Sequence, residues 1–316
     1  MNRLISIQDL DAASLYDLVE TGQRLSDGEL DFSTALKGKL VGLYFSKPST
    51  RTRTSFFAAV ERMGGSTILY SAADLQVTTG ESLEDTGMVL GLYLDAFVMR
   101  TNGSFDEMIT LAESGGGMSV VNALSKAEHP TQAIADLITI RQEFGQLDGR
   151  HVLYIGAWNN TAASLVLALS KLPQTTMTIM TPDKFAPDDA QIDAARRNAS
   201  ESGSSVKVLH DLSMLPRAVD VVYTVRWQSM GDEPADPAWR ESFRGFKVTR
   251  DFMRSVSHEG TIFMHDLPAH RDIEVEAEVI DGPASRVRRQ ALNKMFSAMC
   301  VLERCLKNRR RAHTGL

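Results

Sequence analysis

Cysteine is scarce in this sequence, and long apolar runs are missing. The 316 residues contain only two cysteines, Cys300 and Cys305, in one helical stretch. With no matching pair elsewhere they predict neither a zinc site nor a disulfide framework, and we interpret both as reduced packing residues. No segment approaches the roughly 18 apolar residues of a membrane span, and the first ten residues lack a signal-peptide core. We therefore expect a cytoplasmic protein without a metal.

An excess of positive charge is also absent. Lysine and arginine number 34 against 40 acidic residues, a formal net charge of -6. This balance argues against a broad surface for nucleic acid or anionic membrane, so basic residues near position 51 should have a local role. The 43% hydrophobic content, without repeats or low-complexity tracts, indicates an ordinary globular chain. Its length predicts two domains, at about 100–200 residues each.

The three-glycine spacing of dinucleotide-binding folds is missing as well. A predicted strand ends at Gly156, but the residues that follow it, Ala-Trp-Asn-Asn-Thr, include no further glycine. The next strand ends in Met-Thr-Pro, without the acidic residue that holds a ribose. Nicotinamide binding is therefore not expected, and no cofactor is predicted.

The most informative segment is residues 48–56, Pro-Ser-Thr-Arg-Thr-Arg-Thr-Ser-Phe, between an apolar run at 40–45 and a helix-like stretch at 56–63. A helix N-terminus offers unpaired N–H groups and a positive dipole end. The side chains that would complete an anion cradle are Ser49, Thr50, Arg51 and Thr52. The alternative is that Ser49 or Thr50 merely caps a helix, which requires one such residue rather than a run. We predict a ligand that carries a phosphate.

Periodicity along the chain predicts an α/β fold. An amphipathic helix is expected over 8–25, and the pattern of strands and helices restarts near residue 150. Further strands are predicted at 96–99, 120–123, 151–156, 176–180, 206–209, 219–224 and 261–265, and further helices up to about 144, over 161–172 and over 285–307. We predict two doubly wound parallel-sheet domains joined by interdomain helices. Their bounds are 1–133 and 146–284, with a C-terminal helix, 285–316, packing back on the first domain.

Polar residues follow two further predicted strands, Arg100 after one and His129-Pro130-Thr131-Gln132 after the other. Later motifs are Asn159-Asn160, Ser229-Met230-Gly231, His-Asp-Leu-Pro-Ala-His-Arg at 265–271 and Gln-Ala-Leu-Asn-Lys at 290–294. With the phosphate segment, they resemble the aspartate/ornithine carbamoyltransferase superfamily, and ornithine carbamoyltransferase most. The resemblance covers nearly the whole chain. It implies an enzyme that moves a carbamoyl group from carbamoyl phosphate to an amine.

The resemblance implies a set of donor-site residues that bind carbamoyl phosphate: Ser49, Thr50, Arg51, Thr52, Arg100, His129, Gln132, Leu267 and Lys294. Arg51, with Ser49 and Thr50, would hold the phosphate. Arg53 is expected to brace the segment through an ion pair.

The rest of the donor site would act on the carbamoyl group itself. Attack by an amine places negative charge on the carbonyl oxygen, and Thr52, Arg100 and His129 would stabilise it as fixed donors. Gln132 would hold the carbamoyl NH2. The residues implied to be catalytic are Arg51, Thr52, Arg100, His129 and Asp266. No covalent intermediate is implied, and catalysis would depend on positioning and on charge stabilisation.

The acceptor side departs from the pattern of the ornithine enzyme. The acceptor-site residues implied are Asn160, Val225, Arg226, Gln228, Ser229, Met230 and Asp266. In that family an aspartate stands at the position of Val225, and a valine cannot pair with an ammonium group. Asp266 replaces the family's cysteine, and Lys294 replaces an arginine, which loses the bidentate fork.

Arg226 and Gln228 have the Arg-x-Gln spacing of the aspartate-carbamoylating relatives, which use it to bind carboxylates. Alternatively, Arg226 pairs with Asp232 or Glu233. We therefore expect an acceptor other than free ornithine, a modified diamino acid or a biosynthetic intermediate, with Asp266 orienting or deprotonating its amine. The alternatives are an ornithine carbamoyltransferase proper and a non-catalytic regulatory relative that binds carbamoyl phosphate.

Residues 76–86 resemble the family loop that reaches into a neighbouring subunit's site. This implies a homotrimer with shared active sites. The alternative is that residues 81–84, Glu-Ser-Leu-Glu, are a plain helix N-terminus.

Overall fold

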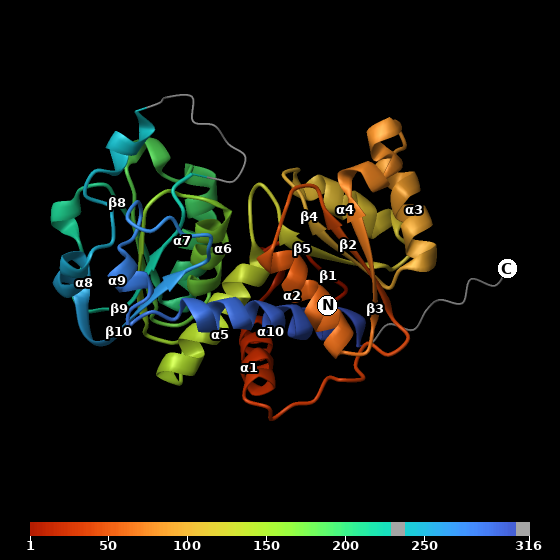
Figure 1. Cartoon of the computed structure of the whole chain (residues 1–316), viewed down its shortest axis with the longest axis horizontal. Helices are drawn as coiled ribbons and strands as arrows, with labels where there is room; N and C mark the ends of the chain where they lie inside the picture. Colours follow the sequence, from red (N-terminus) through yellow and green to blue (C-terminus); the bar gives the residue numbers. More distant parts are fainter. Residues whose placement is uncertain (229–237, 308–316) are drawn as a thin grey trace. The chain divides into compact units, whose positions relative to one another are not determined.

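The computed structural model describes residues 1–228 and 238–307. The chain divides into two compact units (Figure 1). Unit 1 holds Met1–Ala135 and the chain from Leu292 onward, and unit 2 holds Asp136–Ala291. Each unit has one five-stranded sheet of parallel strands with helices on its faces, which confirms the predicted α/β class.

The strands of unit 1 lie in the order β1-β5-β4-β2-β3. Their bounds are β1 (Arg3–Leu4), β2 (Leu40–Phe45), β3 (Ser66–Ser71), β4 (Ala96–Arg100) and β5 (Ser119–Leu124). From β2 the chain moves outward to β3 and then returns to the other side of β2 as β4. The carboxyl ends of β2 and β4 therefore adjoin, with Phe45 opposite Arg100. Open parallel sheets bind ligands at such a switch point.

Unit 1 also contains most of the longer helices. They are α1 (Ala12–Ser26), α2 (Arg51–Arg62), α3 (Leu83–Tyr93), α4 (Phe105–Ser114), and parts of α5 (Pro130–Phe144) and α10 (Val287–Leu306). The short helix η1 (Ile7–Asp9) precedes α1, so the helix predicted over 8–25 is split where Asp11 caps α1 by accepting the Ser14 N–H. Helix α2 begins at Arg51 rather than at Phe56, which corrects the expected start.

The sheet of unit 2 has the order β10-β9-β6-β7-β8. Its strands are β6 (His151–Ile155), β7 (Thr176–Met180), β8 (Ser205–Leu209), β9 (Val219–Thr224) and β10 (Ser257–His265), and its helices include α6 (Asn160–Leu169), α7 (Asp189–Ser202), α8 (Arg250–Val256) and α9 (Ala277–Ile280). The switch point here lies between β6 and β9, where Ile155 is opposite Thr224. The chain segments that follow β6, β9 and β10 thus meet at one edge.

Gly156 directly follows β6, and its backbone conformation and close packing explain the glycine without a bound nucleotide. Its φ is 131°, in the region that favours glycine, and a Cβ there would lie 2.9 Å from the indole Nε1 of Trp227. Trp227 in turn stacks on Phe243 with ring centroids 4.5 Å apart. The glycine therefore lets the segment after β9 pack tightly over the end of β6.

Candidate active site

The first turn of α2 carries the predicted phosphate ligands. Ser49 and Thr52 are buried, whereas Thr50 is exposed at the cap position, where its side chain makes no capping hydrogen bond. The simple capping interpretation therefore does not account for this hydroxyl. Arg51 is partly buried, and Arg53 is exposed and makes no ion pair with any residue in the described part of the chain. The expected brace through Arg53 is not found, because its side chain points to solvent.

Arg100 lies at the carboxyl end of β4 and points toward α2. Its Nη1 donates to Oγ1 of Thr52 over 3.4 Å. The backbone N–H of Ser46 donates to the Arg100 carbonyl over 3.0 Å, which ties the segment after β2 to the end of β4. Two of the three residues predicted to polarise the carbonyl oxygen are therefore adjacent.

His129, the third of these residues, immediately precedes α5 and is buried. Burial lowers the pKa of its imidazole well below the usual value, and the positive charges of Lys294 and Arg100 lower it further. Near pH 7 the ring is therefore neutral. A neutral imidazole polarises a carbonyl as a hydrogen-bond donor and adds no charge that would repel its cationic neighbours.

Lys294 on α10 and Gln132 on α5 are both buried, and Nζ of Lys294 donates to Oε1 of Gln132. An amide oxygen has two lone pairs and accepts hydrogen bonds, which is the chemistry that an NH2 ligand requires. Behind His129, the buried Glu128 accepts from the Ser6 hydroxyl at 2.5 Å and from the Ile7 N–H at 3.0 Å. This contact fixes the segment that carries His129.

Asp266 follows β10 in unit 2. Its Oδ2 accepts a hydrogen bond of 2.9 Å from the hydroxyl of Thr161 on α6, and 17% of its side chain is exposed. Burial raises the pKa of the Tyr154 and Tyr223 phenols well above the usual value, and the Asp266 charge is a further cause for both, after the Asp136 charge for Tyr223. The carboxyl group of Asp266 therefore lies near two neutral phenols.

The residues on either side of Asp266 are held by hydrogen bonds. The Leu267 N–H donates to Nδ1 of the fully buried His265 at 2.9 Å, so this ring carries its proton on Nε2, 3.3 Å from Oε1 of the buried Glu274. The His265 N–H donates to Oε1 of Gln290 at 3.0 Å. Leu267 has φ of 58° and belongs to unit 2, unlike the other predicted donor-site residues.

Gln290 also anchors this segment to a buried polar cluster. Its Nε2 donates to Oδ1 of Asp136 at 2.8 Å and to the Tyr223 hydroxyl at 3.0 Å. The same hydroxyl donates to Oδ2 of Asp136 at 3.0 Å. The cluster links α5, β9 and α10 to the end of β10, and all of its members lie in unit 2.

The other predicted acceptor residues follow β6 and β9. Asn160 is the first residue of α6, Val225 is buried, and Arg226 and Gln228 are partly buried. Among the described atoms, Nε of Arg226 is buried without a hydrogen-bond partner. Two more of these residues, Ser229 and Met230, lie outside the described residues, as do Asp232 and Glu233, the alternative partners of Arg226.

Sequence reasoning missed Thr161, which contacts Asp266 directly. The signal was a polar residue in the first turn of a helix that follows a parallel strand, with Asn159 as the cap. It was overlooked because a threonine so near a helix start is usually explained by capping.

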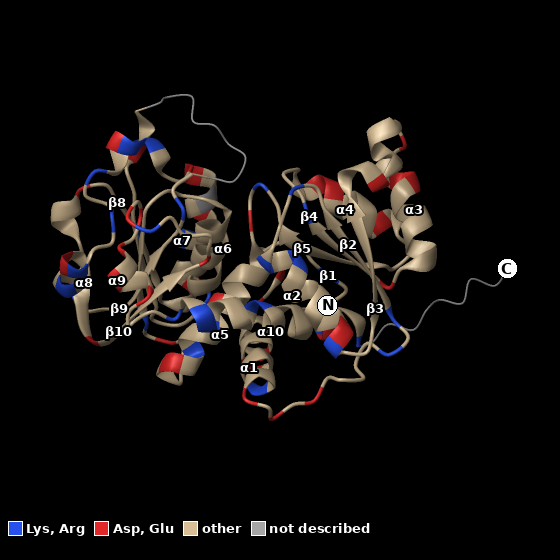
Figure 2. Cartoon of the chain, viewed as in Figure 1, with Lys and Arg blue, Asp and Glu red and all other residues tan. Residues whose placement is uncertain are grey.

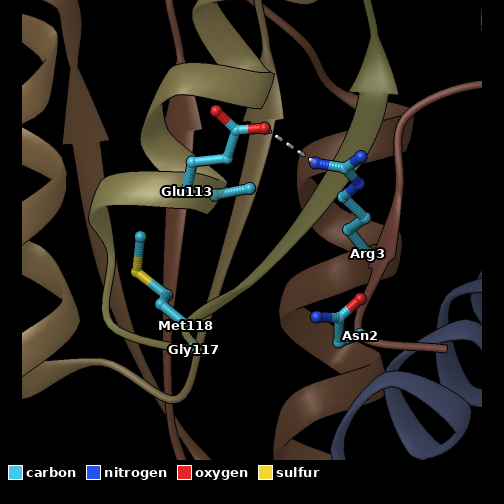
Figure 3. Close-up of a pocket in the computed structure, with 6 residues that line it drawn as sticks. Asn2, Arg3, Glu113, Gly117 and Met118 are labelled. Carbon is cyan, nitrogen blue, oxygen red and sulfur yellow. Dashed lines mark ion pairs between the residues drawn. The ribbon is translucent and has the colours of Figure 1, made fainter.

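A separate cavity of about 390 Å³ lies at the opposite edge of the unit 1 sheet (Figure 3). It is lined by Asn2, Arg3, Ala112, Glu113, Gly117 and Met118. Arg3 and Glu113 form an ion pair of 3.9 Å across it, and both side chains are exposed. Strands β1 and β5 begin there, whereas ligands of parallel sheets bind where strands end, so this cavity is not the substrate site.

Two of the predicted absences concern metals and membranes. Within residues 1–228 and 238–307, no group of three or more His, Cys, Asp or Glu side chains is arranged to hold a metal ion. No described helix is long and apolar enough to cross a membrane. Cys300 and Cys305 are free and buried, and burial raises the pKa of the Cys305 thiol to about 12, as expected of packing residues.

Comparison with known proteins agrees with this geometry. The carbamoyl-P binding domain of aspartate/ornithine carbamoyltransferase matches residues 2–142, and the Asp/Orn binding domain matches residues 148–305. The ornithine carbamoyltransferase of Symbiobacterium thermophilum is 39% identical over 302 residues, which cover 94% of this chain and 96% of that protein. The anabolic ornithine carbamoyltransferase of Pyrococcus furiosus is 38% identical over 301 residues, covering 95% of this chain and 94% of that protein.

Solved structures give the same result. The ornithine carbamoyltransferase from Pyrococcus furiosus superposes with a TM-score of 0.90 at 36% identity, covering 98% of both chains. The enzyme from Gloeobacter violaceus superposes with a TM-score of 0.85 at 34% identity, covering 97% of this chain and 98% of that one. The chain belongs to the aspartate/ornithine carbamoyltransferase family, and it is a carbamoyltransferase.

Proposed function

We propose that this enzyme transfers the carbamoyl group of carbamoyl phosphate to an amino group of an amino-acid-like acceptor other than free ornithine. The products are a ureido compound and phosphate. The observation that carries the donor half is the grouping in unit 1 of Thr52, Arg100, His129 and Lys294. The observation that carries the acceptor half is the carboxylate of Asp266 at the end of β10, together with the buried, apolar Val225.

On the donor side, the phosphate would occupy the N-terminus of α2, against Arg51 and the hydroxyls of Ser49 and Thr50. The carbonyl oxygen would accept hydrogen bonds from Thr52, Arg100 and the neutral imidazole of His129, which would stabilise the charge that develops there. Gln132 would hold the carbamoyl NH2 through Oε1, and Leu267 and Lys294 are the remaining residues of the proposed donor set.

On the acceptor side, a neutral amine would attack the carbamoyl carbon. A C–N bond forms, the bond between that carbon and the bridging oxygen breaks, and phosphate leaves. Asp266 would orient the amine by accepting one of its N–H bonds, and the surplus proton would pass to the departing phosphate or to Asp266. A carboxylate of the acceptor would be held by Asn160, Arg226, Gln228 and Ser229, and the buried Nε of Arg226 supports a role for its guanidinium there.

Ornithine is the second candidate acceptor, because the relatives are named ornithine carbamoyltransferase. The choice depends on Val225. Its side chain is buried and apolar and cannot pair with the ammonium group that a free diamino acid carries. An acceptor whose second amino group is acylated or absent avoids this unpaired charge.

The test is a panel assay with the purified protein and carbamoyl phosphate, which measures phosphate release and ureido product. The amines are ornithine, acylated ornithines, aspartate, putrescine and 2,3-diaminopropionate. We expect turnover with an acylated or shortened amino acid above that with ornithine, and Val225→Asp should raise the kcat/KM for ornithine. Rapid citrulline formation by the unchanged protein would overturn the acceptor proposal, and no phosphate release with any amine would favour a non-catalytic relative.

We also propose that the enzyme works as a homotrimer with shared active sites. Exposed apolar side chains in unit 1 support an interface between copies: Ile68, Leu69, Val77, Met88, Val89, Leu92 and Tyr93. They lie on the edge strand β3, on η3 (Gln76–Thr79) and on α3, which bears no lysine or arginine (Figure 2). A group of this kind on a soluble protein usually marks a contact surface. Ser82 caps α3, so the segment 76–86 ends in a helix start whether or not it reaches a neighbour.

A further inference from the structure

Thr161 makes one side-chain contact that its place in α6 does not require. Its backbone N–H already donates to Oδ1 of Asn159 at 3.0 Å, so the first turn of the helix is capped without the Thr161 hydroxyl. That hydroxyl donates instead to Oδ2 of Asp266 at 2.9 Å, and only 2% of the residue is exposed. The bond joins the ends of β6 and β10 through two side chains.

The backbone around Asp266 is fixed independently of this bond. The His265 N–H donates to Gln290, and the Leu267 N–H donates back to the His265 ring. What these contacts leave undetermined is the rotation of the Asp266 side chain itself. The Thr161 hydroxyl is the contact that sets this rotation.

The second oxygen of Asp266 is left able to accept a proton from an amine. Oδ1 lies 3.6 Å from Nδ1 of His265, but this nitrogen already accepts the Leu267 N–H and has no proton to donate. The hydroxyls of Tyr154 and Tyr223 donate to other groups, a backbone carbonyl and the Asp136 carboxylate. The geometry therefore separates the two oxygens, one held by the protein and one open.

We propose that Thr161 is a positioning residue for the acceptor amine: it holds Oδ2 of Asp266 so that Oδ1 is presented to the attacking nitrogen. This inference rests on the proposed function, because Asp266 orients an amine only if an amine is carbamoylated. Thr161 need not touch either substrate. It acts through Asp266 by limiting the carboxylate to one rotation, which is the kind of orientation on which rates depend.

The test is a double-mutant cycle with Thr161→Val and Asp266→Ala. The probe is carbamoyl phosphate with Nα-acetylornithine, or with ornithine if the acetylated amine is not turned over. Valine keeps the shape of threonine without the hydroxyl, so Thr161→Val should lower kcat about 10-fold while the KM for carbamoyl phosphate changes less than about 2-fold. In the Asp266→Ala background, Thr161→Val should lower kcat no more than about 2-fold, because the two residues act as one unit.

Thr161→Ser is the matched control, because it keeps the hydroxyl and should retain at least about half of the activity. Thermal unfolding of each variant checks the fold, and Thr161→Ala replaces the valine variant if that does not fold. Full activity of Thr161→Val, or an equal loss with and without Asp266, would overturn the inference. If Asp266→Ala has no measurable rate, the comparison of Thr161→Ser with Thr161→Val decides. A loss of kcat in Thr161→Ser equal to that in Thr161→Val would overturn the inference.

The two proposals fail in distinguishable ways. If the unchanged protein releases no phosphate with any amine, the proposed function is wrong. If it turns over an amine but the cycle is additive, only the role of Thr161 is wrong.

Discussion

At the residue scale, the residues proposed for the donor and those proposed for the acceptor use titratable groups in opposite ways. His129 is kept neutral by burial and by neighbouring positive charge, which suits a hydrogen-bond donor to a carbonyl oxygen. Asp266 is partly exposed and has one oxygen held by Thr161, which suits an acceptor for an amine proton. His129 thus stays neutral, and Asp266 presents an oriented lone pair.

The lowered pKa of His129 predicts a dependence of stability on pH. In the unfolded chain a histidine titrates near pH 6.5, whereas in the folded chain His129 does so well below this value. Between the two pKa values the unfolded chain binds the extra proton, so the free energy of unfolding falls as the pH drops below about 6.5, by up to about 1.4 kcal/mol per pH unit.

His129→Gln removes this contribution. Urea denaturation should therefore give a shallower loss of unfolding free energy for His129→Gln than for the unchanged protein between about pH 6.5 and 5.5. His210→Gln is measured in parallel, as the same substitution at an exposed histidine. Equal slopes for all three proteins would show that His129 is not held neutral by the fold.

At the scale of elements, the residues proposed for the donor in unit 1 and those proposed for the acceptor in unit 2 each follow the carboxyl ends of parallel strands. In unit 1, β2 and β4 adjoin at the switch point and supply the start of α2 and Arg100. In unit 2, β6 and β9 adjoin, and β10 places Asp266 against α6. Helix α10 supports the second arrangement through Gln290, whose amide contacts three other elements.

Removing the side-chain amide of Gln290 should lower the stability of the fold. Gln290→Leu leaves the Asp136 carboxylate and the His265 N–H each short of a buried partner, so we expect the free energy of unfolding to fall by about 2–4 kcal/mol. Arg288 is exposed on the same helix, and Arg288→Ala should change the free energy of unfolding by less than about 0.5 kcal/mol. Urea denaturation measures both, and a comparable loss in the two variants would contradict the role assigned to Gln290.

At the scale of the whole molecule, the apolar surface of unit 1 is a feature that a monomer does not explain. Charged residues of both signs are interspersed over the two units (Figure 2). Helix α3, in contrast, ends in the exposed Leu92 and Tyr93. Strand β3 lies at the edge of the sheet of the same unit and exposes Leu69. A second copy of the chain would cover such a surface, as the proposed trimer requires.

The assembly is tested by placing a charge on this surface. Leu92→Glu should shift the protein from trimer to monomer in size-exclusion chromatography with light scattering, because a carboxylate in an apolar interface loses its hydration. Met214 is equally exposed but lies in unit 2, so Met214→Glu should leave the mass unchanged. A monomeric unchanged protein, or a Leu92→Glu trimer, would refute the proposed interface.

The sequence predicted the strands that carry the site well, because buried parallel strands appear as short apolar runs that end in a polar residue. Arg100 ends β4, as this pattern predicts, whereas His129 lies in the segment between β5 and α5, and their roles in the donor site stay predictions. The edge strand β3 was not predicted, because its exposed and partly buried residues give no buried apolar run. The start of α2 was placed too late, since Arg51 and Thr52 look like loop residues until the backbone is seen to be helical around them.

By itself the sequence determined the donor chemistry and the α/β class, because the run of hydroxyls and guanidinia and the apolar runs are local features of the chain. Only the tertiary structure decided which side chains meet. It paired Thr161 with Asp266, 105 residues away, and kept His129 neutral through its burial and the charges of Lys294 and Arg100. Such contacts depend on which strand ends lie side by side, and the spacing of residues along the chain does not contain that information.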